Sequence, residues 1–180
     1  MADRYPIFDL DGTLVDSDAA LVAAFVALGV DPDDISFGHV LGVECARLGI
    51  DVDAYLEAYD VDAAHPFPGV TEMLAELDAW SVCSNKHPSG GRAELARLGW
   101  APQIALFSDA FAGPKELGPV LDHLGLTGAQ IVFVGDTDHD RACAEAVGAP
   151  FLLAGWNPRA QARRGDVVLD DPAEVADHLG

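Results

Sequence analysis

The sequence has little positive charge and few cysteines. Lysine and arginine together contribute 10 of the 180 residues against 30 aspartates and glutamates, which gives a formal net charge of −20. Nucleic acids and anionic membrane surfaces are bound through basic faces, so neither is an expected partner. The three cysteines are an odd number without the spacing of a metal site, which indicates a reduced, cytoplasmic protein.

Long hydrophobic runs and low-complexity tracts are also absent from the sequence. No apolar stretch approaches the length of a membrane span and the N-terminus has no signal-peptide pattern, so we expect no membrane partner. Half of the residues are hydrophobic, and the length suits one ordinary domain with a small insertion. The acidity fits a salt-rich habitat or simply an acidic surface, and composition does not separate the two.

Short apolar runs alternate with helical patterns through most of the chain, which predicts a parallel sheet with helices on both faces. The expected strands lie at 5–8, 80–83, 104–107, 131–134, 150–153 and 167–169. The expected helices of this part lie at 70–77, 88–98, 116–124, 141–147 and 171–179. Pro6 lacks the N–H that a sheet ladder needs, which is awkward within a central strand and tolerable at the first residue of a strand.

Residues 16–66 show a different pattern. Helices are expected at 19–28, 37–48 and 52–59, no strand signal is present, and a stiff, proline-rich segment at 65–69 ends the block. The predicted fold is therefore an α/β, Rossmann-like core formed by residues 1–15 and 67–180. A small helical domain, residues 16–66, is inserted after the first strand.

Polar side chains follow the expected strands at their carboxyl ends, where open parallel sheets bind ligands. In chain order they are Asp9, Asp11, Ser84, Asn85, Lys86, Lys115, Asp136 and Asp140. Two acids that lie two residues apart repel each other unless a proton or a cation intervenes, and magnesium prefers carboxylate and carbonyl oxygens. An Asp-rich turn is the alternative for Asp9 and Asp11 taken alone. Together, the eight side chains have the chemistry of phosphoryl transfer.

The chain resembles phosphohydrolases of the haloacid dehalogenase superfamily along essentially its full length. Phe8–Leu14 is similar to the first motif of that family, Ser84-Asn85 to the second, Lys115 to the third and Val134–Asp140 to the fourth. The block 16–66 resembles the cap that such proteins carry after the first motif, and its shortness predicts a rather open site. Glu116 departs from the proline that often follows the third-motif lysine, which leaves a surface lysine as the alternative for Lys115.

The resemblance implies that four acids act on the phosphoryl group and the metal. Asp9 is implied to be the nucleophile and a ligand of a magnesium ion. Asp11 is implied to be the general acid and base, with its backbone carbonyl on the metal. Asp136 is implied to be the other protein ligand, and Asp140 a ligand through water or a support behind the ligands.

The resemblance implies a phosphate-binding role for the remaining motif residues. Ser84, together with the backbone amides of Leu10 and Asn85, is implied to bind the phosphoryl oxygens. Lys115 is implied to neutralise and orient both Asp9 and the phosphate. Lys86 is either a loop residue near the site or a further contact to phosphate or substrate.

The implied function is that of a magnesium-dependent phosphatase, which hydrolyses a small, phosphoglycolate-like phosphomonoester through an aspartyl phosphate. A sugar phosphomutase shares all four motifs and stays open, although a small cap favours attack by water. Dehalogenases need no leaving-group acid, so the presence of Asp11 disfavours that activity. Phosphonate cleavage needs a cap lysine, and residues 16–66 contain none. A non-catalytic receiver module would place its phospho-acceptor after an interior strand instead.

Few basic side chains are available to bind the part of a substrate that lies beyond its phosphoryl group. The block 16–66 offers Arg47, His39 and His65. Arg47 is expected either to meet an anionic leaving group or to be solvated. His139 lies inside the fourth motif, where the presence of a histidine is explained either by solvent exposure or by a role in function.

Overall fold

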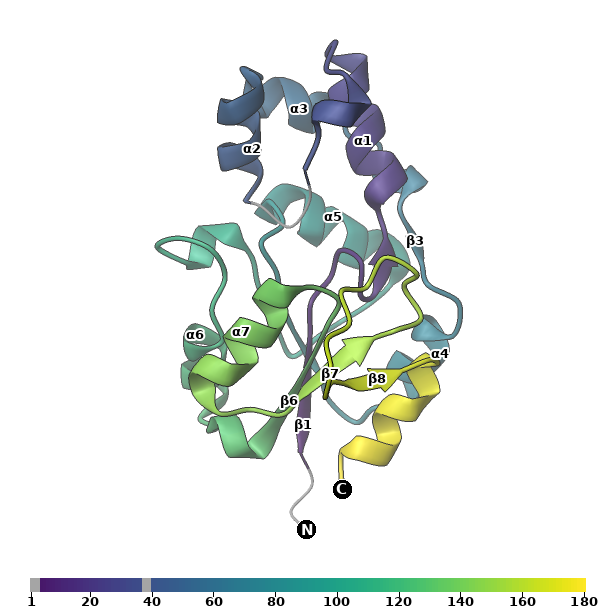
Figure 1. The fold of residues 1–180 in the computed structure, drawn as a ribbon, viewed down its shortest axis with the longest axis vertical. Helices are drawn as coiled ribbons and strands as arrows, with labels where there is room; N and C mark the ends of the chain where they lie inside the picture. Colours follow the sequence, from purple (N-terminus) through teal and green to yellow (C-terminus); the bar gives the residue numbers. More distant parts are fainter. Residues whose placement is uncertain (1–3, 37–39) are drawn as a thin grey trace.

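The computed structural model describes residues 4–36 and 40–180 (Figure 1). Its centre is a six-stranded, all-parallel sheet with the order β5-β4-β1-β6-β7-β8. The strands are β1 (Tyr5–Phe8), β4 (Ser81–Cys83), β5 (Ile104–Leu106), β6 (Ile131–Gly135), β7 (Phe151–Ala154) and β8 (Val167–Leu169). The six predicted strands are confirmed, and each boundary lies within one residue of its expected place.

Helices cover both faces of this sheet, as predicted (Figure 1). They are α4 (Val70–Glu76), α5 (Pro88–Leu98), α6 (Gly118–Leu124), α7 (Asp138–Val147) and the 3-10 helix η5 (Pro172–His178). Because strand side chains alternate between faces, Ile7 packs in a cluster with α6 and α7, whereas Phe8 packs in a cluster with α4, α5 and η5. Helix α7 begins three residues before its predicted start, because Thr137 and Asp140 form a capping box there.

Pro6 is the second residue of β1 and not the first, which is the position where a strand tolerates proline best. Strand β1 lies between β4 and β6, which are both parallel to it. Pro6 is paired with Val132 of β6, but pairing with β4 begins only one residue later, where Ile7 lies opposite Ser81. The missing N–H therefore removes no bond to β4, which explains how a central strand accepts proline.

Three helices stand beyond the carboxyl ends of the strands, at the top of Figure 1. They are α1 (Asp18–Ala27), α2 (Leu41–Leu48) and α3 (Val52–Ala58). The predicted start of the second helix falls on residues 37–39, which lie outside the described residues. The three helices share a hydrophobic cluster of their own, in which the rings of Phe25 and Tyr55 are 4.4 Å apart.

A short ladder joins this helical block to the core. Strand β2 (Val15–Asp16) pairs antiparallel with β3 (His65–Pro66). The expectation that residues 16–66 contain no strand is wrong in this detail, because two residues are too few to show alternation. The predicted boundaries at 15/16 and 66/67 lie in this ladder, and the division into two domains stays a prediction.

The remaining short elements are turns of 3-10 helix. They are η1 (Pro32–Asp34), η2 (Val61–Ala63), η3 (Ser108–Ala110) and η4 (Gly128–Gln130). Within the part of the chain that the structure describes, no helix combines the length and the apolar character that crossing a bilayer requires.

Candidate active site

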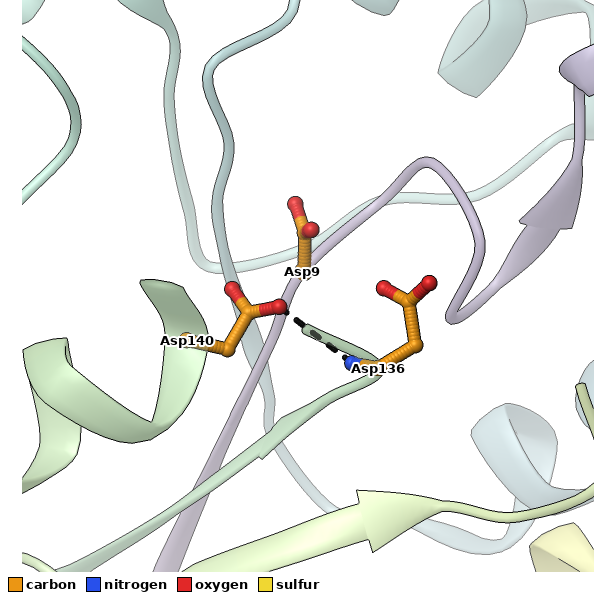
Figure 2. Close-up of side chains that lie close together, drawn as sticks. All are labelled: Asp9, Asp136 and Asp140. Atoms are coloured by element: carbon orange, nitrogen blue, oxygen red, sulfur yellow. Dashed lines mark hydrogen bonds between the residues drawn. The ribbon is translucent and has the colours of Figure 1, made fainter. Parts of the chain in front are cut away.

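Three carboxylates meet at the carboxyl ends of two neighbouring strands. Asp9 follows β1, Asp136 follows β6, and Asp140 lies in the first turn of α7. One oxygen of each lies within 4.8 Å of the others, and Figure 2 shows the side chains around a common space. Because Phe8 lies opposite Val134, the residues that follow them in the two parallel strands emerge side by side. The sheet register therefore brings together acids that are more than a hundred residues apart in sequence.

The Asp136 carboxylate is held from several sides. Thr13 Oγ1 donates to one of its oxygens at 3.3 Å, and Asn157 Nδ2 donates to the other at 3.1 Å. Asn157 also donates to the Gly12 carbonyl at 2.8 Å. Gly12 has a φ of +77°, and a Cβ built there would overlap the Asp136 carboxylate. Only glycine lets the loop approach the acid so closely.

The sequence interpretation missed Thr13 and Asn157 as parts of the site. Thr13 lies inside the first motif, where only its neighbours were given roles. Asn157 comes shortly after β7, so the rule that ligands bind beyond the carboxyl ends of strands would have pointed to it. Both side chains are buried, which is typical of residues that position a charged group.

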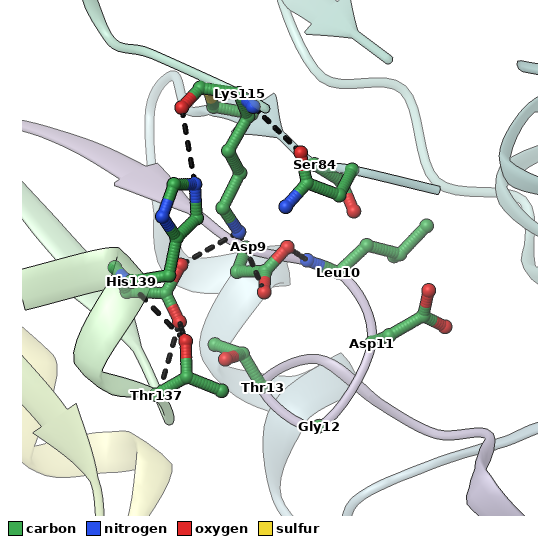
Figure 3. A network of polar contacts seen from close by, with 12 residues as sticks. Asp9, Leu10, Asp11, Gly12, Thr13, Ser84, Lys115, Thr137 and His139 are labelled. Carbon is green, nitrogen blue, oxygen red and sulfur yellow. Dashed lines mark hydrogen bonds and ion pairs between the residues drawn. The ribbon is translucent and has the colours of Figure 1, made fainter. Parts of the chain in front are cut away.

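Lys115 lies inside the acid cluster. Its ammonium nitrogen is 2.8 Å from Asp9 Oδ2 and 2.6 Å from Asp140 Oδ1, and the side chain is only 2 % exposed (Figure 3). Its backbone N–H donates to Asn85 Oδ1 at 2.6 Å, which fixes the residue against the loop after β4. The alternative of a surface lysine is therefore wrong.

The cluster contains more negative than positive charge. Burial raises the pKa of Asp9 to about 6, although Lys115 opposes this. Burial, followed by the charges of Asp9 and Asp140, raises the pKa of Asp136 to about 8. Burial also disfavours the ionised form of Asp140, but the ion pair with Lys115 outweighs it and lowers the pKa of that carboxyl. Three buried acids thus share one ammonium group.

These residues fit a hard divalent cation. Carboxylate oxygens are the ligands that magnesium prefers, and the repulsion that raises the pKa of Asp136 is what such a cation would relieve. Asp9 and Asp136 line the cavity beside the common space, whereas Asp140 is fully buried and is not among the residues that line it. Oδ1 of Asp140 pairs with Lys115, and Oδ2 accepts from the backbone of Asp136 and from Thr137. That arrangement suits a supporting position for Asp140.

The Asp11 carboxylate lies apart from this cluster. Figure 3 shows it turned away from Asp9 and Lys115. Its Oδ1 accepts from Ser17 Oγ at 2.5 Å and is 2.6 Å from the ammonium nitrogen of Lys86. The side chain is therefore not among the clustered acids, and the backbone carbonyl assigned to the metal stays a prediction.

Lys86 belongs to a buried network that the sequence did not reveal. Its ammonium nitrogen is 2.9 Å from Glu94 Oε1 and 3.2 Å from the hydroxyl of Tyr59, which donates in turn to Glu94. Burial opposes the charge of Lys86, but Asp11 and Glu94 outweigh it and raise the pKa of the ammonium group. Glu94 is fully buried on α5. An acidic residue on the apolar face of a helix is the sequence signal from which its place in a buried network could have been predicted.

Among the predicted phosphate-binding groups, Ser84, Asn85 and Lys115 line the same cavity as Asp9, and Leu10 directly follows Asp9. Ser84 directly follows β4 and is buried, and its Oγ accepts from the backbone N–H of Lys86 at 3.2 Å. The Leu10 amide donates to Asp9 Oδ1 at 2.7 Å, so it holds the carboxylate in this structure. Asn85 lies beside Ser84 and binds the backbone of Lys115.

A cavity of about 240 Å³ lies between the strand ends and the helical block. Asp9, Lys115 and Asp136 line its floor, and residues of α1 and α3 line the opposite side. This volume is below the roughly 300–1,000 Å³ of pockets for drug-sized ligands, so it suits a small compound.

The other basic side chains considered as substrate contacts lie in different parts of the structure. Arg47 does not line the cavity; it forms two hydrogen bonds with Glu44, at 2.6 and 2.9 Å, and is about half exposed. His65 is exposed, and His39 lies outside the described residues. His139 lines the cavity, with its Nε2 3.2 Å from the Lys115 carbonyl.

Comparison with known proteins gives a consistent result. A sequence model described as "Haloacid dehalogenase-like hydrolase" matches residues 39–154. A phosphoglycolate phosphatase of Rhodospirillum rubrum is 32% identical over 97% of this chain and 90% of its own length. A phosphoglycolate phosphatase of Xanthomonas campestris pv. campestris is 28% identical over 96% of both chains.

A solved structure agrees with these relatives. The structure of a HAD-superfamily hydrolase, subfamily IA, from Geobacter sulfurreducens matches 99% of this chain and 100% of its own with a TM-score of 0.72 and 25% identity. The predicted family and fold are thereby confirmed. The chain belongs to the haloacid dehalogenase-like hydrolases, and within them it is similar to phosphoglycolate phosphatases.

Proposed function

We propose that the protein hydrolyses small phosphomonoesters in a magnesium-dependent reaction that passes through a phosphate ester of Asp9. The observation that carries this proposal is the convergence of Asp9, Asp136 and Asp140 within 4.8 Å, with Lys115 paired to Asp9. The full-length relatives named phosphatases support it. In this proposal residues 16–66 act as a cap over a core formed by residues 1–15 and 67–180.

In the proposed site, Asp9, Asp136 and the backbone carbonyl of Asp11 would hold magnesium, and Asp140 would support the cluster through its contacts with Lys115 and Thr137. The bound cation supplies positive charge, which lowers the repulsion between an anionic nucleophile and an anionic phosphoryl group. Lys115 supplies a second positive charge, because its ammonium group is paired with Asp9. Ser84 and the amides of Leu10 and Asn85 bind the phosphoryl oxygens and hold phosphorus in line with the Asp9 oxygen.

In the first step, an oxygen of Asp9 attacks phosphorus and the bond to the leaving oxygen breaks. The leaving alkoxide takes a proton from the Asp11 carboxyl group, which makes Asp11 the general acid. In the second step, water attacks phosphorus, its proton passes to Asp11, and the Asp9 carboxylate and inorganic phosphate are released. Asp11 must turn from Lys86 and Ser17 toward the phosphoryl group to play this part.

The proposal is tested with p-nitrophenyl phosphate and a pair of variants. Asp9→Asn keeps the shape of the side chain but removes the nucleophile, so we expect turnover to fall by at least about a thousandfold, the scale of losing a main catalytic group. Asp122→Asn, a change at an exposed acid of α6, is the matched control and should retain wild-type activity. Excess EDTA should stop the wild-type reaction, and added magnesium should restore it.

Trapping the intermediate separates this mechanism from direct attack by water. Borohydride reduces an acyl phosphate to an alcohol, so mass spectrometry of protein quenched during turnover should find the modification at Asp9. Wild-type rates for folded Asp9→Asn, or undiminished activity in EDTA, would contradict the proposal. With a sugar phosphate as the substrate, recovery of a rearranged sugar phosphate in place of inorganic phosphate would indicate a mutase.

A further inference from the structure

The cavity over the acid cluster has two sides of opposite chemical character. Its floor carries the acids and Lys115, but the side formed by the helical block is mostly apolar, with Asp18, Ser36 and Glu44 as its polar side chains. The apolar lining comes from α1, α3, the first residue of α2 and the residue that follows η1, with the side chains of Leu21, Phe25, Ile35, Leu41, Tyr55 and Leu56. A phosphoryl group bound at Asp9 would therefore direct the rest of its ester toward aliphatic and aromatic side chains.

The positive charges along this cavity are already matched by carboxylates. Among the described residues that line it, the lysines and arginines are Lys86, Lys115 and Arg159. Lys115 pairs with Asp9 and Asp140, and Lys86 pairs with Asp11 and Glu94. Arg159, at the exposed rim, is 3.0 Å from an oxygen of Asp16 and 2.8 Å from one of Asp18.

Two further acids add negative charge to the lining of the cavity. Asp18 and Glu44 both line the cavity, and Glu44 is buried. Glu44 binds Arg47, whose guanidinium group lies outside the cavity lining. A second anionic group directed toward the helical block would thus meet Asp18, Glu44 and mostly apolar side chains, and burying a charge without a partner is strongly unfavourable.

We propose that this cavity selects phosphomonoesters whose alcohol part is uncharged and has an apolar, branched or aromatic body. A carboxylate in the same position, as in 2-phosphoglycolate, is disfavoured. The inference rests on the proposed function, since it concerns the leaving group of the same reaction. Leu56 is the residue through which the preference is tested, because it lines the cavity from α3 and is only partly buried.

A matched pair of substrates measures this preference. Isobutyl phosphate and 2-phosphoglycolate have nearly the same shape, because two methyl groups in one take the place of the carboxylate oxygens in the other. Both leaving groups are primary alkoxides. We expect kcat/KM of the wild-type protein to be at least about tenfold higher for isobutyl phosphate, since one apolar group in a fitted pocket is worth that much or more.

Variants test whether the helical block causes this preference. Leu56→Arg places a cation in the apolar wall, so the ratio of the two kcat/KM values should fall by about tenfold or more in favour of 2-phosphoglycolate. Val26→Arg adds the same charge at an exposed position of α1 outside the cavity lining and should leave the ratio unchanged. Leu56→Gln, which introduces no charge, should lower the rate with isobutyl phosphate alone.

The outcomes are distinct from those of the catalytic proposal. A wild-type ratio of one or less, or a ratio that Leu56→Arg does not move, overturns the selectivity inference. Hydrolysis of either compound that depends on magnesium and on Asp9 upholds the phosphatase in both cases. If p-nitrophenyl phosphate and both esters are left intact, the proposed function itself fails.

Discussion

Magnesium should stabilise the protein far more at alkaline than at acidic pH. The reason is Asp136, whose pKa is raised to about 8 by burial and by the neighbouring acids, and Asp9, whose pKa is raised to about 6. An acid with a raised pKa keeps its proton in the folded state at pH values where the unfolded chain has lost it. The metal-free fold therefore loses stability as the pH rises from about 4 to about 8.

The size of the effect follows from the same values. One pKa unit corresponds to about 1.4 kcal/mol, so moving the pKa of Asp136 from 3.8 to about 8 destabilises the ionised, metal-free fold by at most roughly 6 kcal/mol. Structural relaxation and water reduce this figure. If about 2 kcal/mol remains, the melting temperature of a chain of this size falls by about 4–8 °C.

The assay is thermal unfolding at about pH 5, 6.5 and 8.5, in EDTA and in magnesium chloride, with sodium chloride added to match the ionic strength. We expect the melting temperature in EDTA to fall across this series and the gain from magnesium to grow. Asp136→Asn should flatten both trends, whereas Asp122→Asn at an exposed site should not. A gain from magnesium that is the same at every pH, or that survives in Asp136→Asn, would refute the reasoning.

Two further predictions concern the loop after β1 and the buried network. Gly12→Ala should weaken magnesium binding in calorimetry by about tenfold or more, because the new Cβ would overlap the Asp136 carboxylate. The control is Gly29→Ala, which also lies at positive φ but has open space around it. This control should lose only about 1 kcal/mol of stability to backbone strain and should bind magnesium as tightly as the wild-type protein. Lys86→Met should lower both kcat and the melting temperature, because it leaves Asp11 and the buried Glu94 without their cation. Adding Glu94→Gln to this variant should restore the melting temperature but not kcat. Recovery of both would contradict a role for Lys86 in placing Asp11.

Much of the fold could be predicted because its signals are local. Each strand of the sheet is a short apolar run, such as 131–134, and a run of this kind has few alternatives once helical patterns flank it. The first motif and the acids after 131–134 could be placed at one edge of the sheet because parallel strands share the direction of their carboxyl ends. The ladder of β2 and β3 could not be predicted, because two paired residues leave no periodic pattern.

The sequence by itself determined the order of the elements, the family resemblance and which acids lie at the strand ends, because each of these depends on residues close together in the chain. Only the tertiary structure decided that Asp11 pairs with Lys86, that Asn157 donates to Asp136, and that the side of the cavity formed by the helical block is mostly apolar. Those contacts join segments that are distant in sequence. Their geometry is set by how helices pack against a sheet, which no local pattern of residues records.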